Sequence, residues 1–112
     1  MSDISQVELD KLFFALSHLK RREIIMTLSY RPATIDQLAK EHRLSLPAIH
    51  KHIKTLEGSG LVRRKKTGRT NFLALNPPRL AEIKLWSMQF NTAWGSNHES
   101  LENYIQQLTN QE

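Results

Sequence analysis

Apolar residues recur along this chain at steps of three and four residues, the spacing that places side chains on one face of an α-helix. Within residues 7–16 this stripe consists of Leu9, Leu12, Phe13 and Leu16. Within residues 19–29 it consists of Ile24, Ile25 and Leu28. The pattern therefore predicts two short helices. Phe14 falls off the first stripe, on a side that a lone domain would leave in water, which hints at a second apolar contact.

Residues 34–59 predict a second pair of helices separated by a short turn. Thr34 and Gln37 have the spacing of a capping box, so a helix is expected to begin there and to end near His42. Ser45 is a plausible N-cap for the next helix, which Gly58 to Gly60 would end. The inner stripe of that helix is Ile49, Ile53 and Leu56. Two short helices joined by a tight turn form the helix-turn-helix arrangement.

The outer face of the second helix carries small, basic and polar residues. Such a face can enter the major groove of DNA without a clash. Those that we expect in the groove are Pro47, Ala48, His50, Lys51 and Lys54, and those that we expect near phosphates are Ser45 and Thr55. The alternative is an ordinary solvated helix face.

Residues 61–75 predict a β-hairpin with strands at Leu61–Lys65 and Thr70–Leu75 and a tip at Thr67-Gly68. Either Phe72 and Leu75 or Leu73 and Leu75 would pack on the helices. Basic residues crowd the hairpin, and their mutual repulsion favours an external anion. The residues expected to anchor this wing on DNA are Arg64, Lys66 and Arg69. The alternative is a charged edge that prevents aggregation.

A further basic cluster, Lys20-Arg21-Arg22, stands in the first turn of the second helix, where positive charge opposes the helix dipole. We interpret it as a solvated cluster, with a nearby phosphate as the alternative.

Residues 79–109 carry a heptad-like apolar seam after the break at Asn76-Pro77-Pro78. The segment is expected to be one bent helix or two helices broken near Gly95-Ser96. Its large aromatic residues seldom remain exposed, so we expect a homodimer in which this segment pairs together with residues 7–16. The expected interface residues are Leu9, Phe13, Phe14, Trp86, Phe90, Trp94, Leu101, Tyr104 and Leu108. The alternative is a hairpin that folds the tail back on its own domain.

Composition narrows the choice of partner. A chain of 112 residues suits one domain, taken as 1–112, and its net charge of +5 favours nucleic acid first and an anionic membrane surface second. The absence of cysteine excludes disulfides, thiolate metal sites and cysteine nucleophiles, and fits a reducing compartment. No apolar run approaches a membrane span, and the polar start has no signal-peptide pattern, so we expect a cytoplasmic protein without a membrane partner.

These motifs together resemble the ArsR/SmtB family of bacterial winged-helix transcriptional regulators. The resemblance covers about residues 9–108 and is carried by the strings Leu16–Ile25, Leu46–Leu56, Gly60–Val62 and Gly68-Arg69. It implies a mostly α-helical winged helix-turn-helix fold with a small β-hairpin and a long C-terminal dimerisation helix. It also implies double-stranded DNA as partner, with two recognition helices in successive major grooves. His50 stands where the family often has Ser.

The same resemblance raises metal sensing as an alternative. Family metal sites use cysteines near the recognition helix, which are absent, or Asp and His on the last helix, where only His98, Glu99 and Glu102 are available. His50 and His52 are two residues apart on a helix and so diverge too widely to chelate one ion. We therefore expect no metal and no other cofactor; the sequence does not identify a small-molecule effector.

An enzyme is not expected, because no phosphate-binding glycine loop, nucleophile elbow or acid–base pair is present. The sequence thus predicts a homodimeric repressor that binds a pseudo-palindromic operator. A winged-helix protein-interaction module remains the alternative from another class.

Overall fold

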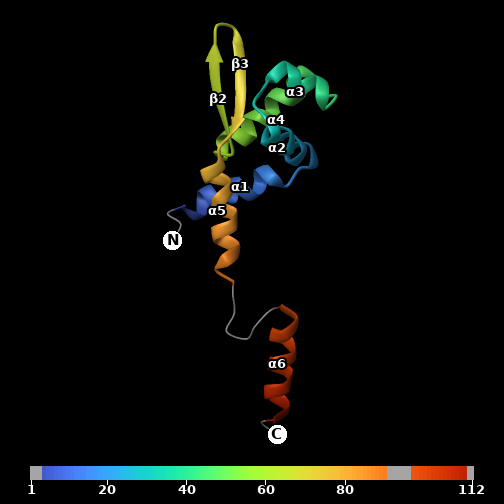
Figure 1. The fold of residues 1–112 in the computed structure, drawn as a ribbon, viewed down its shortest axis with the longest axis vertical. Helices are drawn as coiled ribbons and strands as arrows, with labels where there is room; N and C mark the ends of the chain where they lie inside the picture. The colour runs from blue at the N-terminus through green and yellow to red at the C-terminus, as the bar shows by residue number, and fades with distance from the viewer. Residues whose placement is uncertain (1–3, 91–96, 111–112) are drawn as a thin grey trace.

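The computed structural model describes residues 4–90 and 97–110 of the chain, which form helices and one small sheet (Figure 1). The helices are α1 (Gln6–Leu16), α2 (Leu19–Tyr30), α3 (Ile35–Glu41), α4 (Leu46–Gly58), α5 (Pro77–Met88) and α6 (Asn97–Asn110). The strands are β1 (Ala33–Thr34), β2 (Val62–Thr67) and β3 (Thr70–Leu75). They pair antiparallel in the order β1-β3-β2. The expected mostly α-helical winged fold is confirmed.

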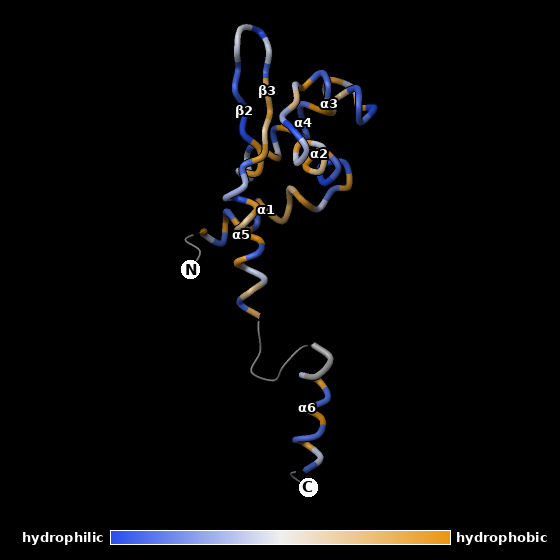
Figure 2. Tube along the Cα trace, viewed as in Figure 1, coloured by the Kyte–Doolittle hydropathy of each residue, from blue (hydrophilic) through white to orange (hydrophobic). Residues whose placement is uncertain are grey.

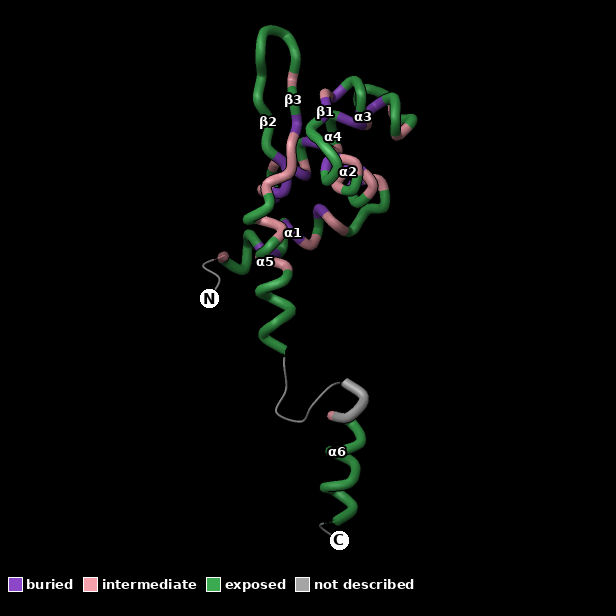
Figure 3. The backbone as a smooth tube through the Cα atoms, viewed as in Figure 1, coloured by how far each residue is buried: buried purple, intermediate pink, exposed green. Residues whose placement is uncertain are grey.

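The core lies where α1, α2, α3 and α4 meet the inner end of the hairpin (Figure 3). The predicted stripes supply it: Leu12, Ile24 and Leu28 are buried, as are all three residues of the α4 stripe. Ala15 is buried as well, although the sequence analysis passed over it. Phe14 is 62% exposed, as its position off the stripe predicts.

The helix-turn-helix begins and ends where the capping residues predict. The Thr34 side chain accepts from Gln37 N at 3.1 Å, and the Gln37 side chain accepts from Thr34 N at 2.9 Å, which completes the capping box. Ser45 Oγ accepts from Ala48 N at 3.3 Å at the start of α4. In the turn between them, Arg43 adopts a positive φ of 53°, in a position where a glycine would relieve strain.

The sheet settles the register of the hairpin and corrects its bounds. Leu73 is fully buried and pairs with Ala33 of β1 on one side and Arg64 of β2 on the other. Phe72 points to the other face and is 43% exposed, so the pair that packs on the helices is Leu73 and Leu75. Strand β1 was missed, because two residues leave too short a pattern to detect.

The turn of the hairpin also differs from the prediction. Thr67 and Thr70 pair with one another, so the two-residue turn is Gly68-Arg69 rather than Thr67-Gly68. Gly68 has a φ of +62°, which a two-residue hairpin turn favours and which glycine adopts without steric cost. As a result Arg69 lies in the turn at the tip of the wing.

Of the two alternatives for the C-terminal segment, the structure has two helices, α5 and α6, rather than one bent helix. Helix α5 begins at Pro77, two residues earlier than expected, because proline fits the first turn of a helix. It ends at Met88, with Gln89 as C-cap, well before the predicted break at Gly95-Ser96, which lies outside the described residues. Helix α6 lies beyond the end of α5, away from the core (Figure 1).

The assigned register predicts unequal costs for two neighbouring truncations in β3. Leu73→Ala should lower the free energy of unfolding by about 2–5 kcal/mol, because it leaves a cavity between the sheet and the helices. Phe72→Ala is the matched control and should cost less than about 1 kcal/mol, since its side chain is partly in water. Urea unfolding monitored by circular dichroism measures both values. Equal losses would mean that the strand is shifted by one residue.

Candidate nucleic-acid interface

The outer face of α4 is exposed along the whole helix. Pro47, His50, Lys51 and Lys54 are exposed, and Ala48 and Thr55 on its flank are partly exposed. Ser45 is exposed too, but its hydroxyl oxygen already accepts from the backbone at the start of α4. All seven residues predicted on this helix therefore lie together on one accessible surface. Figure 2 shows that β2, the strand that follows α4, consists largely of hydrophilic residues.

Two arginines of the wing are held by the protein itself. Arg64 donates from Nε and an Nη to the two carboxylate oxygens of Glu57, at 3.2 and 2.6 Å. Glu57 stands in the last turn of α4, so this bidentate pair fixes the wing to the recognition helix. Arg63 donates to Asn76 Oδ1 at 2.6 Å, at the base of the wing. The guanidinium of Arg64 thus positions the wing, and its expected role as a DNA anchor stays a prediction, since the side chain remains 30% exposed.

The remaining basic side chains of the wing point into solvent. Lys65, Lys66 and Arg69 are exposed, and among the ion pairs of the described residues none involves them. Two of them, Lys66 and Arg69, are among the predicted wing anchors. Their positive charge is thus available to a ligand rather than consumed inside the fold.

A cleft of about 140 Å³ lies between the wing tip and the helix-turn-helix, and two of the predicted DNA-binding residues line it. His50 of α4 lines one side and Arg69 of the hairpin turn lines the other. The rest of the lining consists of Thr34, Ile35, Asp36, Thr70 and Asn71. The arrangement brings the outer face of α4 and the tip of the wing to one continuous surface.

The basic cluster at the start of α2 lies elsewhere, and its interpretation as a solvated group is wrong for Arg21, whereas Arg22 is exposed and Lys20 is partly exposed. Arg21 is only 7% exposed, and its guanidinium donates to the carbonyls of Ala15 and Phe14 at 2.7 and 3.0 Å. Arg22 donates to Leu16 O at 2.7 Å. These carbonyls end α1, where the negative pole of its dipole attracts positive charge.

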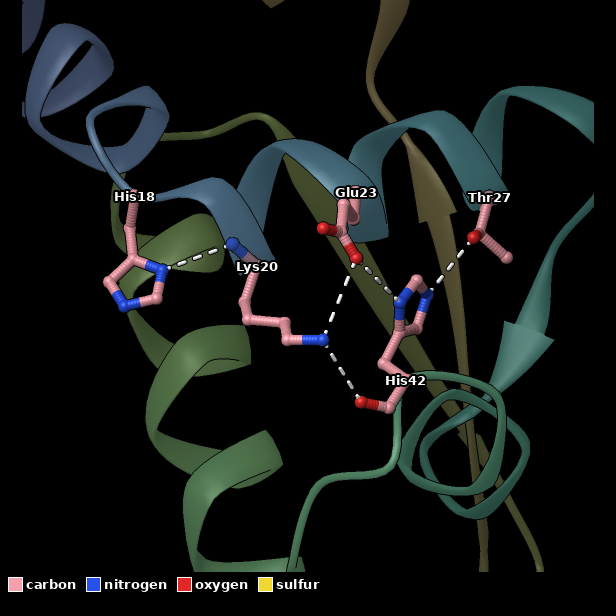
Figure 4. A network of polar contacts seen from close by, with 5 residues as sticks. All are labelled: His18, Lys20, Glu23, Thr27 and His42. Atoms are coloured by element: carbon pink, nitrogen blue, oxygen red, sulfur yellow. Dashed lines mark hydrogen bonds and ion pairs between the residues drawn. The ribbon is translucent and has the colours of Figure 1, made fainter.

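Lys20 meets the end of the other neighbouring helix (Figure 4). Its Nζ donates to the His42 carbonyl at 3.3 Å, at the C-cap of α3, and lies 3.7 Å from Glu23. The His42 ring contacts Thr27 Oγ1 at 3.0 Å and Glu23 at 3.8 Å. The cluster is structural. The sequence signal that pointed to it is the unfavourable charge at the start of α2, which needs compensation from nearby groups.

The residues predicted for a dimer interface lie in different environments. Leu9 is 6% exposed, so its expected interface role is corrected: it belongs to the core of its own chain. Phe13, Trp86 and Phe90 form a row of edge-to-face contacts between α1 and α5, with ring centroids 5.0 and 4.9 Å apart. Trp94 lies outside the described residues.

The outer side of this row remains in water. Phe14 and Phe90 are 62% and 61% exposed. On α6, the large apolar residues that are about half exposed or more are Leu101, Tyr104, Ile105 and Leu108. This is more apolar surface than scattered single residues account for.

The described part of the chain contains neither a cluster of metal ligands nor a membrane-spanning helix. No group of three or more His, Asp or Glu side chains that fits a metal ion occurs among those residues. The side chains of His98 and Glu99, which the sequence offers as candidate metal ligands, are not among the described side chains. Within the same ranges no helix has the length and apolar character needed to cross a bilayer.

The fold and the exposed basic surface define a winged helix-turn-helix protein of the DNA-binding class. Comparison with known proteins identifies the family. Residues 19–64 match the model of the bacterial regulatory proteins of the arsR family. The chain is 31% identical over 75 residues to the HTH-type transcriptional regulator Rv2034 of Mycobacterium tuberculosis, which covers 67% of this chain and 70% of that one.

Two solved structures share the fold. The ArsR-like transcriptional regulator from Rhodococcus sp. RHA1 matches with a TM-score of 0.79 and 26% identity, over 100% of this chain and 99% of that one. The homodimeric winged helix-turn-helix DNA-binding domain Mb0332 of Mycobacterium bovis matches with a TM-score of 0.64 and 16% identity, over 79% and 88% of the two chains. The chain belongs to the ArsR family of transcriptional regulators. The expectation that it is not an enzyme is confirmed by these relatives.

The Glu57–Arg64 pair should show a measurable coupling in a double-mutant cycle. Because both side chains are about a third exposed, we expect Glu57→Gln and Arg64→Gln to couple by about 0.5–1 kcal/mol in unfolding free energy. The control cycle pairs Glu57→Gln with Lys66→Gln, whose coupling should be near zero. Equal coupling in the two cycles would contradict the pairing.

Proposed function

We propose that this chain is a homodimeric repressor that binds a pseudo-palindromic operator without needing a metal ion. Its DNA-binding surface comprises the outer face of α4 and the solvent-facing cations of the wing. The residues assigned to the groove are Pro47, Ala48, His50, Lys51 and Lys54, with Ser45 and Thr55 near phosphates and Lys66 and Arg69 on the backbone beside the wing. A regulator of DNA acts in the compartment that holds DNA, which supports a cytoplasmic location.

One observation carries the proposal: the lysines of α4 and the cations of the wing tip share a surface and have no carboxylate partner among the described ion pairs. Unpaired cations on one face repel one another and attract a polyanion. The spacing of small and basic residues on α4 suits a major groove, and a basic hairpin suits the adjacent phosphates.

The exposed aromatic row supports a dimer through α1 and α5, continued by α6. The structural relative from Mycobacterium bovis is homodimeric, and two-fold pairing would present two recognition helices to one duplex. Selection of duplexes from a random pool by the purified chain tests the whole proposal. The expected product is a two-fold repeated motif whose half-sites lie about one helical turn, or a multiple of it, apart.

A protein-interaction module on the same fold is the competing function. Salt distinguishes the two. DNA binding should weaken steeply as salt rises, because each neutralised phosphate releases counterions. Binding that does not change with the salt concentration would favour a protein partner.

Metal independence has its own test: removal of metal with a chelator, or addition of zinc, should leave the affinity for the selected duplex unchanged.

Lys51→Ala should weaken binding to the selected duplex by about 1–3 kcal/mol and relax its sequence preference, if Lys51 contacts a base edge. Fluorescence anisotropy on the selected duplex and on a scrambled one measures both effects. Lys84→Ala, an exposed lysine on α5, is the control and should change neither. An equal loss on the two duplexes would make Lys51 a phosphate contact instead.

Phe90→Asp should convert the dimer to monomer, because a carboxylate on the aromatic row cannot be buried without a partner. Sedimentation equilibrium measures the change. Met26→Asp on α2 provides the control, since its side chain is as exposed as that of Phe90, 62% against 61%, and belongs to another face. An unchanged mass for Phe90→Asp would refute this interface.

A further inference from the structure

Arg21 contacts both α1, which belongs to the proposed dimer face, and α4, the recognition helix. It stands in the first turn of α2, and two of its nitrogens donate to the carbonyls that end α1. A third nitrogen, on the same guanidinium, lies 3.4 Å from Nδ1 of His52 in α4. The guanidinium also lies 5.2 Å from the centre of the Phe14 ring, which packs over it as a cation–π partner. One buried cation therefore touches both helices.

His52 and His18 complete this junction with two neighbouring rings. Their ring centroids lie 4.7 Å apart. His18 Nδ1 accepts from Lys20 N at 3.1 Å, so that nitrogen carries no proton. His52 Nδ1 faces a guanidinium, which can only donate, so it too acts as an acceptor.

Every charged group that faces His52 in the described part of the chain is positive or becomes positive in acid. These groups are Arg21 from α2, His18 from the α1–α2 connection and Lys51 from the same helix. From α1 the junction receives backbone carbonyls, which bind Arg21 and leave His52 without a carboxylate. Burial, and then these three charges, hold the pKa of His52 below its ordinary value.

We propose that Arg21 is a positioning residue that seats the recognition helix on α1 through His52, and that protonation of His52 loosens this seat. A protonated His52 offers no acceptor at Nδ1 and places a second positive charge beside Arg21. The consequence for operator affinity rests on the proposed function. The junction itself does not depend on DNA.

Acid therefore opposes the seated state. Because the seated helix holds the pKa of His52 below the ordinary value of about 6.5, a proton binds more tightly to the released helix. The stabilisation of the seated helix is complete at pH values above that ordinary pKa. It is lost as the pH falls through the depressed pKa of His52.

Hydrogen exchange of the α4 backbone amides in the full chain, without DNA, tests the proposal. The opening constant derived from exchange should rise as the pH falls from about 7.5 to about 5.5, because the released helix binds the proton more tightly. His52→Asn keeps an acceptor for Arg21 but does not titrate, so its opening constant should not change with pH. His50→Gln, on the outer face of the same helix, should respond to pH as the natural chain does.

Arg21→Lys tests the positioning role separately. A lysine lacks the planar fork that reaches three acceptors, so α4 should open more readily at both pH values. A wild-type opening constant in Arg21→Lys, or a wild-type pH response in His52→Asn, would overturn the proposal. If His52→Asn does not fold, NMR titration of the His52 ring in the natural chain decides: a pKa at or above the ordinary value refutes it. A chain that passes these tests but binds no DNA would refute the proposed function alone.

Discussion

The helix-turn-helix is held in place by three cations that meet the carbonyl ends of two helices. Lys20 binds the end of α3, and Arg21 and Arg22 bind the end of α1. Each helix leaves its last carbonyls without an intrahelical partner, and those carbonyls carry the negative pole of the dipole. The positive charge that disfavours the start of α2 thus stabilises the C-terminal ends of α1 and α3, and it holds both helices against α2.

The wing depends on a second set of contacts, which begins in the core and ends at the surface. Leu73 fixes the face that β3 turns to the helices, and β1 adds two residues of pairing at its edge. Glu57 then holds the first half of β2 through Arg64. Beyond that pair the hairpin extends away from the helices (Figure 1), so its tip is positioned by strand pairing alone. That division leaves Lys66 and Arg69 accessible while the base of the wing stays fixed.

The parts of this structure that follow local rules were predictable, and those that follow long-range pairing were not. Helix starts are capped by the side chains of Thr34, Gln37 and Ser45 through contacts three residues away. The sequence therefore predicts these starts correctly. Gly68 marks a turn, but the exact turn residues depend on a register that only the buried Leu73 decides. Arg21 and Arg64 look alike in sequence to any surface arginine, because their partners, Ala15, His52 and Glu57, lie on other elements. Heptad spacing in the tail predicts an apolar face, yet it does not predict that α5 ends at Met88.

These reassignments change what the net charge of +5 means. Arg64 is paired with the Glu57 carboxylate, and Arg21 is buried against backbone carbonyls, which satisfy its donors but do not neutralise its charge. The lysines of α4 and the cations of the wing tip are exposed on adjacent surfaces, and the ion pairs of the described residues involve none of them. A polyanion is attracted by local density of unpaired charge rather than by the total. The fold therefore uses Arg21 for internal order and leaves the lysines of α4 and the cations of the wing tip close together in solvent, where their local density favours a polyanion.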